Sequence, residues 1–391
     1  MMIFWRATLL RSLLIFTLLS ISASLSPSPK KQVARYTTTS QRQSFQDDGF
    51  IVVSGLLSVE ENEQLVAAGQ TIVDKADEKS SFYFKLAERG IMICGPSNPE
   101  LNEKDRAAIV DGFRSVALRS KIPHVAAELM GLDPSEENVR ILRDVFLGKS
   151  VQDQKCCGWH VDDTSFWPES YTSSPSGDGI NAWIAMQDMP SSLGGGLGLA
   201  AGSHVADWRH TAYDSLGLDV SKEGLTKDQV YQQIKDSGLL SCVLHKTNHE
   251  LHEKMEAIGH VPDLKCGDVI FHTRWLFHKT DPLTDAGRIH YENNGLSVLN
   301  RYSVRYVPGT ARLPLSFVNE LSILSEPSNS GKMLNEVDGA WYPEVWPSLE
   351  DDIDTKMRML ISGRIPDATK TMQSNLSELL QLLSEPIRTD Q

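Results

Sequence analysis

The sequence is poor in cysteine and in positive charge, and it shows no internal repeat. Five cysteines are spread irregularly over 391 residues, and none forms a Cys-x-x-Cys pair. An odd, irregular set in a chain this long argues against a disulfide framework, although one bridge in an oxidising compartment stays open. The missing Cys-x-x-Cys argues against a structural zinc site, and the missing repeat argues against a repeat architecture.

Basic residues are outnumbered by acidic ones. Lysine and arginine number 38 against 51 aspartate and glutamate, which gives a formal net charge of -13. Such a chain has no electrostatic footprint for a phosphate backbone, so we expect no nucleic-acid partner. The length leaves room for a large core and for more than one domain.

A run of about 20 apolar residues, the length that a transmembrane helix needs, is also absent. The N-terminal run from Ser12 to Ala23 is uncharged but shorter, and it ends in small residues. We therefore predict a signal peptide or targeting segment over residues 1–23 and a linker over 24–44. This predicts the secretory pathway or an organelle, without a stable membrane span in the mature chain. An uncleaved membrane anchor is the alternative.

What the sequence does contain is a pair of potential metal ligands among aromatic residues, in the stretch from Cys156 to Pro168. His160 and Asp162 stand two apart, and on an extended strand such residues point to the same face. An imidazole and a carboxylate aimed at one point are ligands for a first-row metal. A distant third ligand would complete a two-histidine, one-carboxylate triad. A His-x-Asp pair alone is equally typical of a surface loop.

The rest of the chain predicts short strands, glycine-rich turns and helices placed mainly before the strands. This pattern is typical of a mainly β fold with flanking helices. A capping box at Ser58 and Glu61 marks one helix start. The expected helices are residues 56–74, 104–118, 124–132, 228–235 and 249–258, with a final amphipathic helix in the C-terminal extension of residues 311–391. The expected strands are residues 50–53, 137–149, 178–189, 264–271 and 297–307.

Two segments are open to rival interpretations. Residues 191–203 are glycine-rich, but without a Gly-Lys-Ser/Thr they predict a loop and not a phosphate-binding P-loop. Residues 205–262 form a polar insertion, in which His245, His249 and His252 would share one helix face. We interpret that face as solvated in preference to a metal site, since the glutamate of His-Glu-x-x-His is missing.

Four separated blocks, taken in order, resemble the phytanoyl-CoA dioxygenase family of Fe(II)- and 2-oxoglutarate-dependent oxygenases. They are the His-x-Asp stretch, the strand NAWIAMQDM, the glycine-rich loop ending in Gly-Ser-His, and Gly-Asp-Val-Ile-Phe followed by His278. The opening FQDDGFIVVSGLL also fits the family's style. The resemblance covers residues 45–308. It implies a double-stranded β-helix, a cupin-like jelly-roll barrel, as an oxygenase domain over residues 45–310 with the insertion 205–262.

The resemblance also implies the metal ligands. His160 and Asp162 match the family's proximal ligands and His278 the distal one, with His272 as a rival for the distal position. Three protein ligands leave three positions on Fe(II), two for the keto acid and one for O2. Related halogenating enzymes lack the carboxylate, so the presence of Asp162 favours hydroxylation.

Further residues match the part of the family's site that binds 2-oxoglutarate. Trp183 matches the tryptophan beside 2-oxoglutarate, and Thr280 is the small hydroxyl residue two positions after the distal histidine. The family also places an arginine against the far carboxylate, for which a guanidinium is suited. We favour Arg301, then Arg305, because both share one face of a predicted strand. Arg288 has nearly the family's spacing but lies in a stretch that predicts a loop.

The resemblance thus predicts an Fe(II)- and 2-oxoglutarate-dependent dioxygenase. Such an enzyme would use O2 to hydroxylate a small-molecule or lipid-like substrate, with release of succinate and CO2. The alternative is a catalytically inactive jelly-roll binding protein that keeps the fold. Zinc-dependent hydrolysis at the same triad is disfavoured, because zinc hydrolase sites do not call for a keto-acid clamp.

Overall fold

The computed structural model describes residues 35–78, 112–152, 156–162, 179–205, 242, 244–312, 331–337 and 342–347. All of them belong to one compact unit. The predicted targeting segment and residues 24–34 of the predicted linker lie outside the described residues, and the rest of that linker runs into helix α2 (Thr39–Asp48). The helix expected at 228–235 and the final amphipathic helix also lie outside them, together with much of the helix expected at 104–118.

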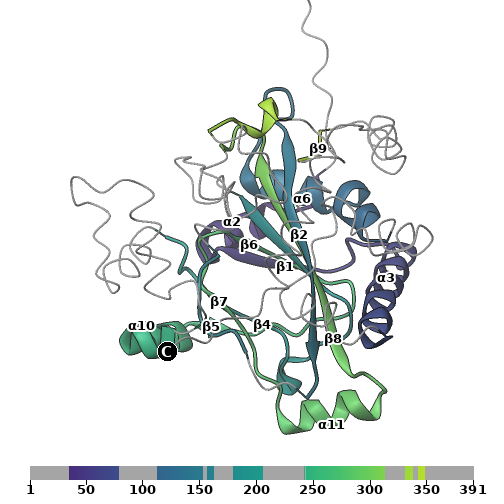
Figure 1. Cartoon of the computed structure of the whole chain (residues 1–391). Helices are drawn as coiled ribbons and strands as arrows, with labels where there is room; N and C mark the ends of the chain where they lie inside the picture. Colours follow the sequence, from purple (N-terminus) through teal and green to yellow (C-terminus); the bar gives the residue numbers. More distant parts are fainter. Residues whose placement is uncertain are drawn as a thin grey trace, which may run out of the picture. The chain divides into compact units, whose positions relative to one another are not determined.

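Helices and strands follow one another in the order that Figure 1 shows. The helical elements are α2 (Thr39–Asp48), α3 (Val59–Glu78), a π-helical segment (Ser115–Arg119), α6 (Ile122–Met130), 3-10 turns (Ser191–Leu193 and Leu334–Glu336), α9 (Leu244–Thr247), α10 (His249–Ala257) and α11 (Asp285–Asn293). The strands are β1 (Phe50–Val53), β2 (Val139–Ser150), β3 (Ile180–Ala185), β4 (Leu197–Ala200), β5 (Gly259–His260), β6 (Val269–Thr273), β7 (His278–Thr280), β8 (Val298–Pro308) and β9 (Glu344–Trp346).

The described strands form two antiparallel sheets. The larger has the strand order β1-β6-β3-β8-β2-β9, and the smaller has the order β5-β4-β7. Strand β8 lies between β3 and β2, with Ser303 opposite Trp183 on one side and opposite Val145 on the other. Because successive residues of a strand point to opposite faces, β8 supplies side chains to both faces of the larger sheet.

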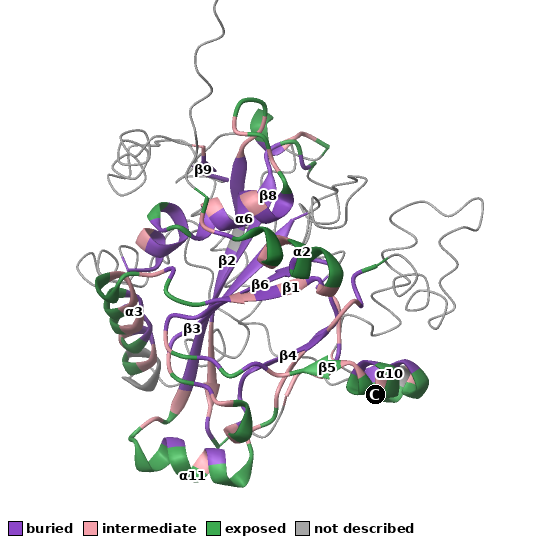
Figure 2. Ribbon diagram, turned by 180° about the vertical axis from the view of Figure 1, so that it is seen from behind, coloured by how far each residue is buried: buried purple, intermediate pink, exposed green. Residues whose placement is uncertain are grey.

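One face of the six-stranded sheet is apolar and is covered by helices. Phe271 of β6 and the β8 residues Tyr302 and Val304 are fully buried in it. Side chains of α2, α3 and α6 pack against them, among them Phe45 and Leu65. Figure 2 shows the buried strands at the centre, with exposed residues on α3. Each large side chain buried here contributes about 1.5–3 kcal/mol to folding.

The opposite face carries buried polar side chains at positions that alternate with the apolar ones. They are 7% exposed or less and comprise Asn181, His272, Arg301, Ser303 and Arg305. An apolar cluster continues this face and includes Trp183, Ile270, Leu197, Leu199 and Leu299. Polar groups in an interior need partners, so this face is the natural place for a site.

A glycine fixes the entry into the sheet. Gly49 ends α2 with a left-handed φ of 82° and directs the chain into β1. A Cβ at this position would lie 2.5 Å from Nδ1 of His204, so no other residue fits without movement. The other ring nitrogen of His204 donates to the Gln46 carbonyl at 3.0 Å. His204 is therefore tied into the fold.

The predicted capping box is present at the start of α3. The Ser58 backbone N–H donates to Oε2 of Glu61 at 2.7 Å, and the Glu61 N–H donates to the Ser58 hydroxyl at 3.1 Å. Two backbone donors at the helix end are thereby satisfied. No helix among the described residues combines the length and the apolar character that a bilayer crossing requires.

The predicted fold class, mainly β with flanking helices, is confirmed. The two sheets of the described residues do not close into a barrel, so the jelly-roll barrel stays an expectation. Two local predictions are wrong. Residues 191–203 are not a single loop, because they contain a 3-10 turn and β4. Arg288 lies in helix α11, which begins after a Thr284 cap that accepts a hydrogen bond from the Gly287 N–H at 2.9 Å.

Candidate metal centre

The three predicted metal ligands lie together, although His278 follows His160 much later in the chain. The two histidines form an isolated antiparallel bridge, in which each backbone N–H donates to the other's carbonyl at 3.0 Å. Their ring centroids are 4.3 Å apart. Asp162 follows on the same short segment as His160, as the His-x-Asp spacing predicts. Backbone pairing thus brings the imidazoles together.

The donor atoms of this group converge. Oδ1 of Asp162 lies 3.5 Å from Nε2 of His160 and 3.9 Å from Nε2 of His278. All three donor atoms lie within 4.8 Å of one another. Metal–nitrogen bonds are about 2 Å long, so donors at these separations can reach one ion with little movement.

Both imidazoles are oriented by the backbone. Nδ1 of His160 donates to the Gly158 carbonyl at 2.8 Å, and Nδ1 of His278 donates to the Leu276 carbonyl at 3.0 Å. A carbonyl oxygen can only accept, so each Nδ1 carries the proton and each Nε2 keeps a free lone pair. Metal-binding histidines are typically held in this way.

The charge state also suits a cation. Burial opposes the charged form of Asp162, but the Arg305 guanidinium holds the pKa of this carboxyl well below its usual range. Burial, together with the neighbouring His160, lowers the pKa of His278 well below its usual value. Metal ligands must be deprotonated, and these two residues are.

The rival histidine of the sequence analysis is occupied elsewhere. His272 lies on β6, with its ring centroid 4.8 Å from that of His278. Its Nδ1 donates to the Thr273 carbonyl at 2.9 Å, and its Nε2 accepts from the Asn181 amide at 2.8 Å. Burial lowers the pKa of His272 to about 4. Both ring nitrogens are engaged, so His272 has no lone pair to offer a metal.

The three candidate arginines have different surroundings. Arg301 is 4% exposed on the polar face of β8, and its Nε and Nη2 are buried without a hydrogen-bond partner. Arg305, on the same face, donates from Nη2 to Oδ2 of Asp162. Arg288 pairs instead with Asp285 of its own helix at 2.6 Å. Only Arg301 and Arg305 therefore share the polar face of the larger sheet.

The remaining predicted residues lie on β3 of the larger sheet and on β7 of the smaller one. Trp183 is 3% exposed on β3, directly opposite Ser303. The Ser303 hydroxyl donates to Oδ1 of Asn181 at 2.6 Å. Thr280 stands two residues after His278 on β7 and is half-buried, and its backbone N–H donates to the Cys157 carbonyl at 2.9 Å.

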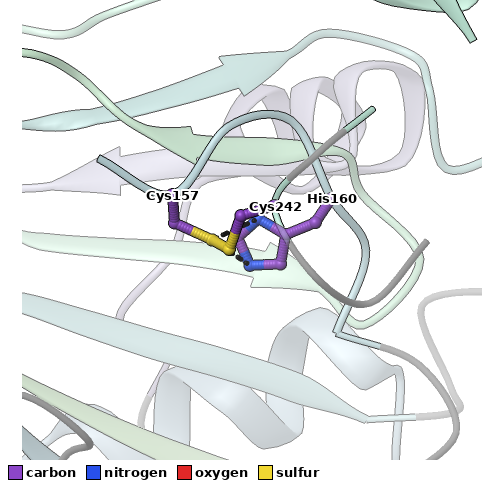
Figure 3. A group of neighbouring side chains, drawn as sticks. All are labelled: Cys157, His160 and Cys242. Atoms are coloured by element: carbon purple, nitrogen blue, oxygen red, sulfur yellow. Dashed lines mark hydrogen bonds between the residues drawn. A yellow bond between two sulfur atoms is a disulfide. The ribbon is translucent and has the colours of Figure 1, made fainter. Parts of the chain in front are cut away.

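Two further groups of possible ligands occur among the described residues. His249, His252 and Glu253 of α10 have donor atoms within 4.8 Å of one another, on the face that the sequence predicts as solvated. Cys157 and Cys242 lie beside the triad but are joined by a disulfide, so neither offers a thiolate. Figure 3 shows this disulfide against the imidazole of His160.

Sequence reasoning missed Asn181 and the pairing of the two cysteines. Asn181 stands two residues before Trp183 on a predicted strand, so alternation along that strand could have placed it on the same face. No sequence signal identifies the disulfide, because Cys157 and Cys242 are 85 residues apart and follow no recognisable spacing.

Comparison with protein families gives one match over much of the chain. The family model described as phytanoyl-CoA dioxygenase (PhyH) matches residues 45–289, which include all three triad residues. That family consists of 2-oxoglutarate-dependent non-haem oxygenases. The predicted family, the enzyme class and the use of Fe(II) and 2-oxoglutarate are thereby confirmed. The match ends before β8, so it leaves out the candidate arginines of that strand.

Comparison with solved structures gives further matches. The carbocyclase SnoK from nogalamycin biosynthesis, a non-haem α-ketoglutarate-dependent enzyme, has 16% identity and a TM-score of 0.49, covering 81% of this chain and 100% of its own. EctD from S. alaskensis, with 2-oxoglutarate and 5-hydroxyectoine, has 15% identity and a TM-score of 0.42, covering 79% and 89%. No curated protein sequence matches the chain. At these identities and scores, the assignment rests on the family match.

Proposed function

Because this chain belongs to the phytanoyl-CoA dioxygenase family, we propose that it hydroxylates a small-molecule or lipid-like substrate in an Fe(II)- and 2-oxoglutarate-dependent reaction that releases succinate and CO2. The observation that carries this proposal is the convergence of His160, Asp162 and His278. Their donor atoms lie within 4.8 Å, with both Nε2 atoms directed at one carboxylate oxygen.

The donor set fits ferrous iron. Two imidazole nitrogens and one carboxylate oxygen form the facial triad that non-haem iron oxygenases use. Arg305 engages Oδ2 of Asp162, which leaves Oδ1 as the oxygen that faces the histidines. Asp162 would therefore bind the ion through one oxygen, and the triad would leave positions for other ligands. When bound, Fe(II) and 2-oxoglutarate would supply the electrons that activate dioxygen for oxidation of the substrate.

Arg301 is the residue that we propose for the far carboxylate of 2-oxoglutarate. A guanidinium buried without partners is costly, and a bound carboxylate would satisfy it with charge-assisted hydrogen bonds. Burial lowers the pKa of Arg301 to about 10, so the group remains charged at neutral pH. Ser303, two residues along the same face, donates its hydroxyl to Asn181 and so helps to order the wall next to Arg301.

Apolar side chains complete the surroundings. Trp183 lies opposite Ser303 and belongs to a buried cluster with Ile270 and Leu299. These side chains would keep water from the keto acid, which strengthens its interaction with Arg301. They also supply apolar surface next to the metal, which supports a substrate with an apolar portion.

The proposal is tested by turnover and by metal content in the same preparations. The metal-free full chain is given Fe(II) and 2-oxoglutarate, and succinate and bound iron are measured. We expect His160→Ala, Asp162→Ala and His278→Ala each to lower succinate formation at least about 100-fold. Losing a ligand costs more than losing one of its hydrogen-bond partners. The exposed histidine variant His249→Ala should behave as wild type.

The amount of bound iron distinguishes the proposed enzyme from the alternative, a catalytically inactive binding protein. Iron content that is unchanged in all three variants would contradict the site and favour a binding protein of the same fold. For the keto acid, we expect Arg301→Leu to weaken 2-oxoglutarate binding by about 10- to 100-fold, the value of a charge-assisted hydrogen bond. Iron binding should be retained, and Arg288→Leu is the matched control.

A further inference from the structure

A disulfide joins the ligand-bearing segment to a distant part of the chain. Cys157 lies three residues before His160, and its partner Cys242 lies just before α9. Figure 3 shows both sulfurs close to the imidazole of His160. Sγ of Cys157 is 3.3 Å from Nδ1 and 3.8 Å from Nε2 of this ring, so the sulfur packs against the imidazole as a whole. The disulfide and the triad therefore share the imidazole of His160.

The two chain segments that the disulfide joins are packed closely against each other. A Cβ added to Gly158 would lie 2.7 Å from the carbonyl oxygen of Cys242, so the two backbones are packed together. Cys242 itself has a φ of 63°, a left-handed conformation that is uncommon for a residue with a side chain. Such a conformation persists when the surroundings hold it, and the disulfide is one of the contacts of Cys242.

The same segment is also part of the backbone ladder that holds both histidines. The Cys157 carbonyl accepts from the Thr280 N–H at 2.9 Å, next to the paired hydrogen bonds of His160 and His278. The Gly158 carbonyl, which orients the His160 ring, belongs to the residue directly after Cys157. Movement of Cys157 would therefore disturb both the ring and its hydrogen-bond acceptor.

We propose that the Cys157–Cys242 disulfide positions His160 for metal binding, and that its reduction by a dithiol lowers the affinity of the triad for ferrous iron. This inference rests on the proposed role of His160 as a ligand. In the reaction, two electrons and two protons pass from the dithiol to the S–S bond. Two cysteine thiols form, and the reductant becomes a disulfide. Iron affinity then depends on the redox state of a bond outside the metal's ligand set.

Metal binding of the full chain tests this inference directly. Oxidised protein, protein reduced with a dithiol that is then removed, and Cys157→Ala and Cys242→Ala variants are titrated anaerobically with Fe(II), and with Co(II) as a spectroscopic probe. We expect the reduced protein and both variants to bind about 10- to 100-fold more weakly, the range for losing a group that orients a ligand. Reduction should have no further effect on the variants.

Cys156→Ala is the matched control, because Cys156 is adjacent and free and its sulfur accepts from Lys149 Nζ at 3.4 Å. It should bind metal as the oxidised wild type does. Circular dichroism checks that each form is folded, and reoxidation of the reduced wild type should restore its affinity. A bond with a purely structural role would change the unfolding temperature but leave the affinity and the Co(II) spectrum of the folded protein unchanged.

Three outcomes overturn the inference. One is equal affinity in the oxidised and reduced proteins. Another is a set of thiolate-to-cobalt bands after reduction, which would make the cysteines ligands and not a constraint. The third is oxidised protein that binds no metal, or a His160→Ala variant that binds as well as wild type. This last result contradicts the proposed function as well, whereas the first two leave it standing.

Discussion

The two faces of the six-stranded sheet are equally buried but built for different purposes. Tyr302 and Val304 of β8 enter the apolar face under the helices, while Arg301, Ser303 and Arg305 enter the opposite face. The first set loses little on leaving water and gains packing. The second set loses hydration and is compensated only by specific partners. One strand thus serves the stability of the fold on one side and the site on the other.

Burial alone does not distinguish the core of this sheet from its site. All five β8 residues are 7% exposed or less. What distinguishes the polar face is that one of its buried side chains has polar atoms that are not satisfied within the protein. Arg301 keeps two buried donor atoms without a partner, whereas Tyr302 donates its hydroxyl to Oδ2 of Asp144 at 2.6 Å. Unsatisfied polar groups mark the face that is prepared for a ligand.

The largest expected loss of stability comes from a substitution on the apolar face. Phe271→Ala removes a fully buried ring from the cluster under the helices, so we expect the free energy of unfolding to fall by about 3–5 kcal/mol. Urea unfolding measures this change. The metal affinity of the folded fraction should match that of wild type, because the ring points away from the triad. A large change in that affinity would break the distinction between the two faces.

A buried histidine should make the polar face sensitive to acid. The pKa of His272 is lowered to about 4 from an ordinary value of 6.5. The unfolded chain therefore binds a proton between pH 6.5 and 4 that the folded chain does not. Stability is fully present above pH 6.5 and falls as the pH drops through this window, by up to about 3 kcal/mol from this residue.

We expect His272→Gln to remove this part of the acid sensitivity. Urea unfolding of the metal-free protein at pH 7 and at pH 4.5 measures the difference, and the loss of stability between the two should be smaller in the variant. Glutamine retains a side-chain acceptor for the Asn181 amide. An identical loss in wild type and variant would show that His272 is not the source.

The smallest expected losses of stability come from removing one hydroxyl from each of two neighbouring residues of β8. Tyr302→Phe removes a hydroxyl from the apolar face and should cost about 1–3 kcal/mol, since Asp144 loses a buried partner. Ser303→Ala removes a hydroxyl from the polar face, where it donates to Asn181. We expect it to cost about 1 kcal/mol and to weaken 2-oxoglutarate binding, which Tyr302→Phe should not do. Urea unfolding measures the stability of each variant, and titration measures its affinity for 2-oxoglutarate. Weaker 2-oxoglutarate binding in Tyr302→Phe but not in Ser303→Ala would contradict the assignment of the two faces.

Much of this architecture could be predicted from the sequence, because its signals are local. The capping box of Ser58 and Glu61, the helical spacing along α3 and the alternation along β8 each depend on a few neighbouring residues. The convergence of His160 and His278 is not local, and it was reached through a resemblance and not through spacing. The structure adds the backbone bridge that explains their proximity.

The features that escaped prediction depend on contacts between distant segments. Helix α11 is not predicted from the sequence because Gly287 weakens its helical pattern. The structure requires glycine at this position, since a Cβ would lie 2.0 Å from the Leu193 carbonyl oxygen. The role of Arg305 depends on Asp162, which reaches it only through the fold. The disulfide likewise pairs residues that no local pattern connects.

Strand β1 pairs with β6, which the ribosome synthesises much later. Phe50 pairs with His272, so 272 − 50 = 222 residues must be added before the first strand can meet its partner. At about 5–20 residues per second, this takes about 10–40 s. During that time β1 has no neighbour in its sheet, and an unpaired strand is a template for wrong association. Non-local pairing of this kind is also slow to form, so we expect the yield of folded enzyme to depend on protection of the nascent chain.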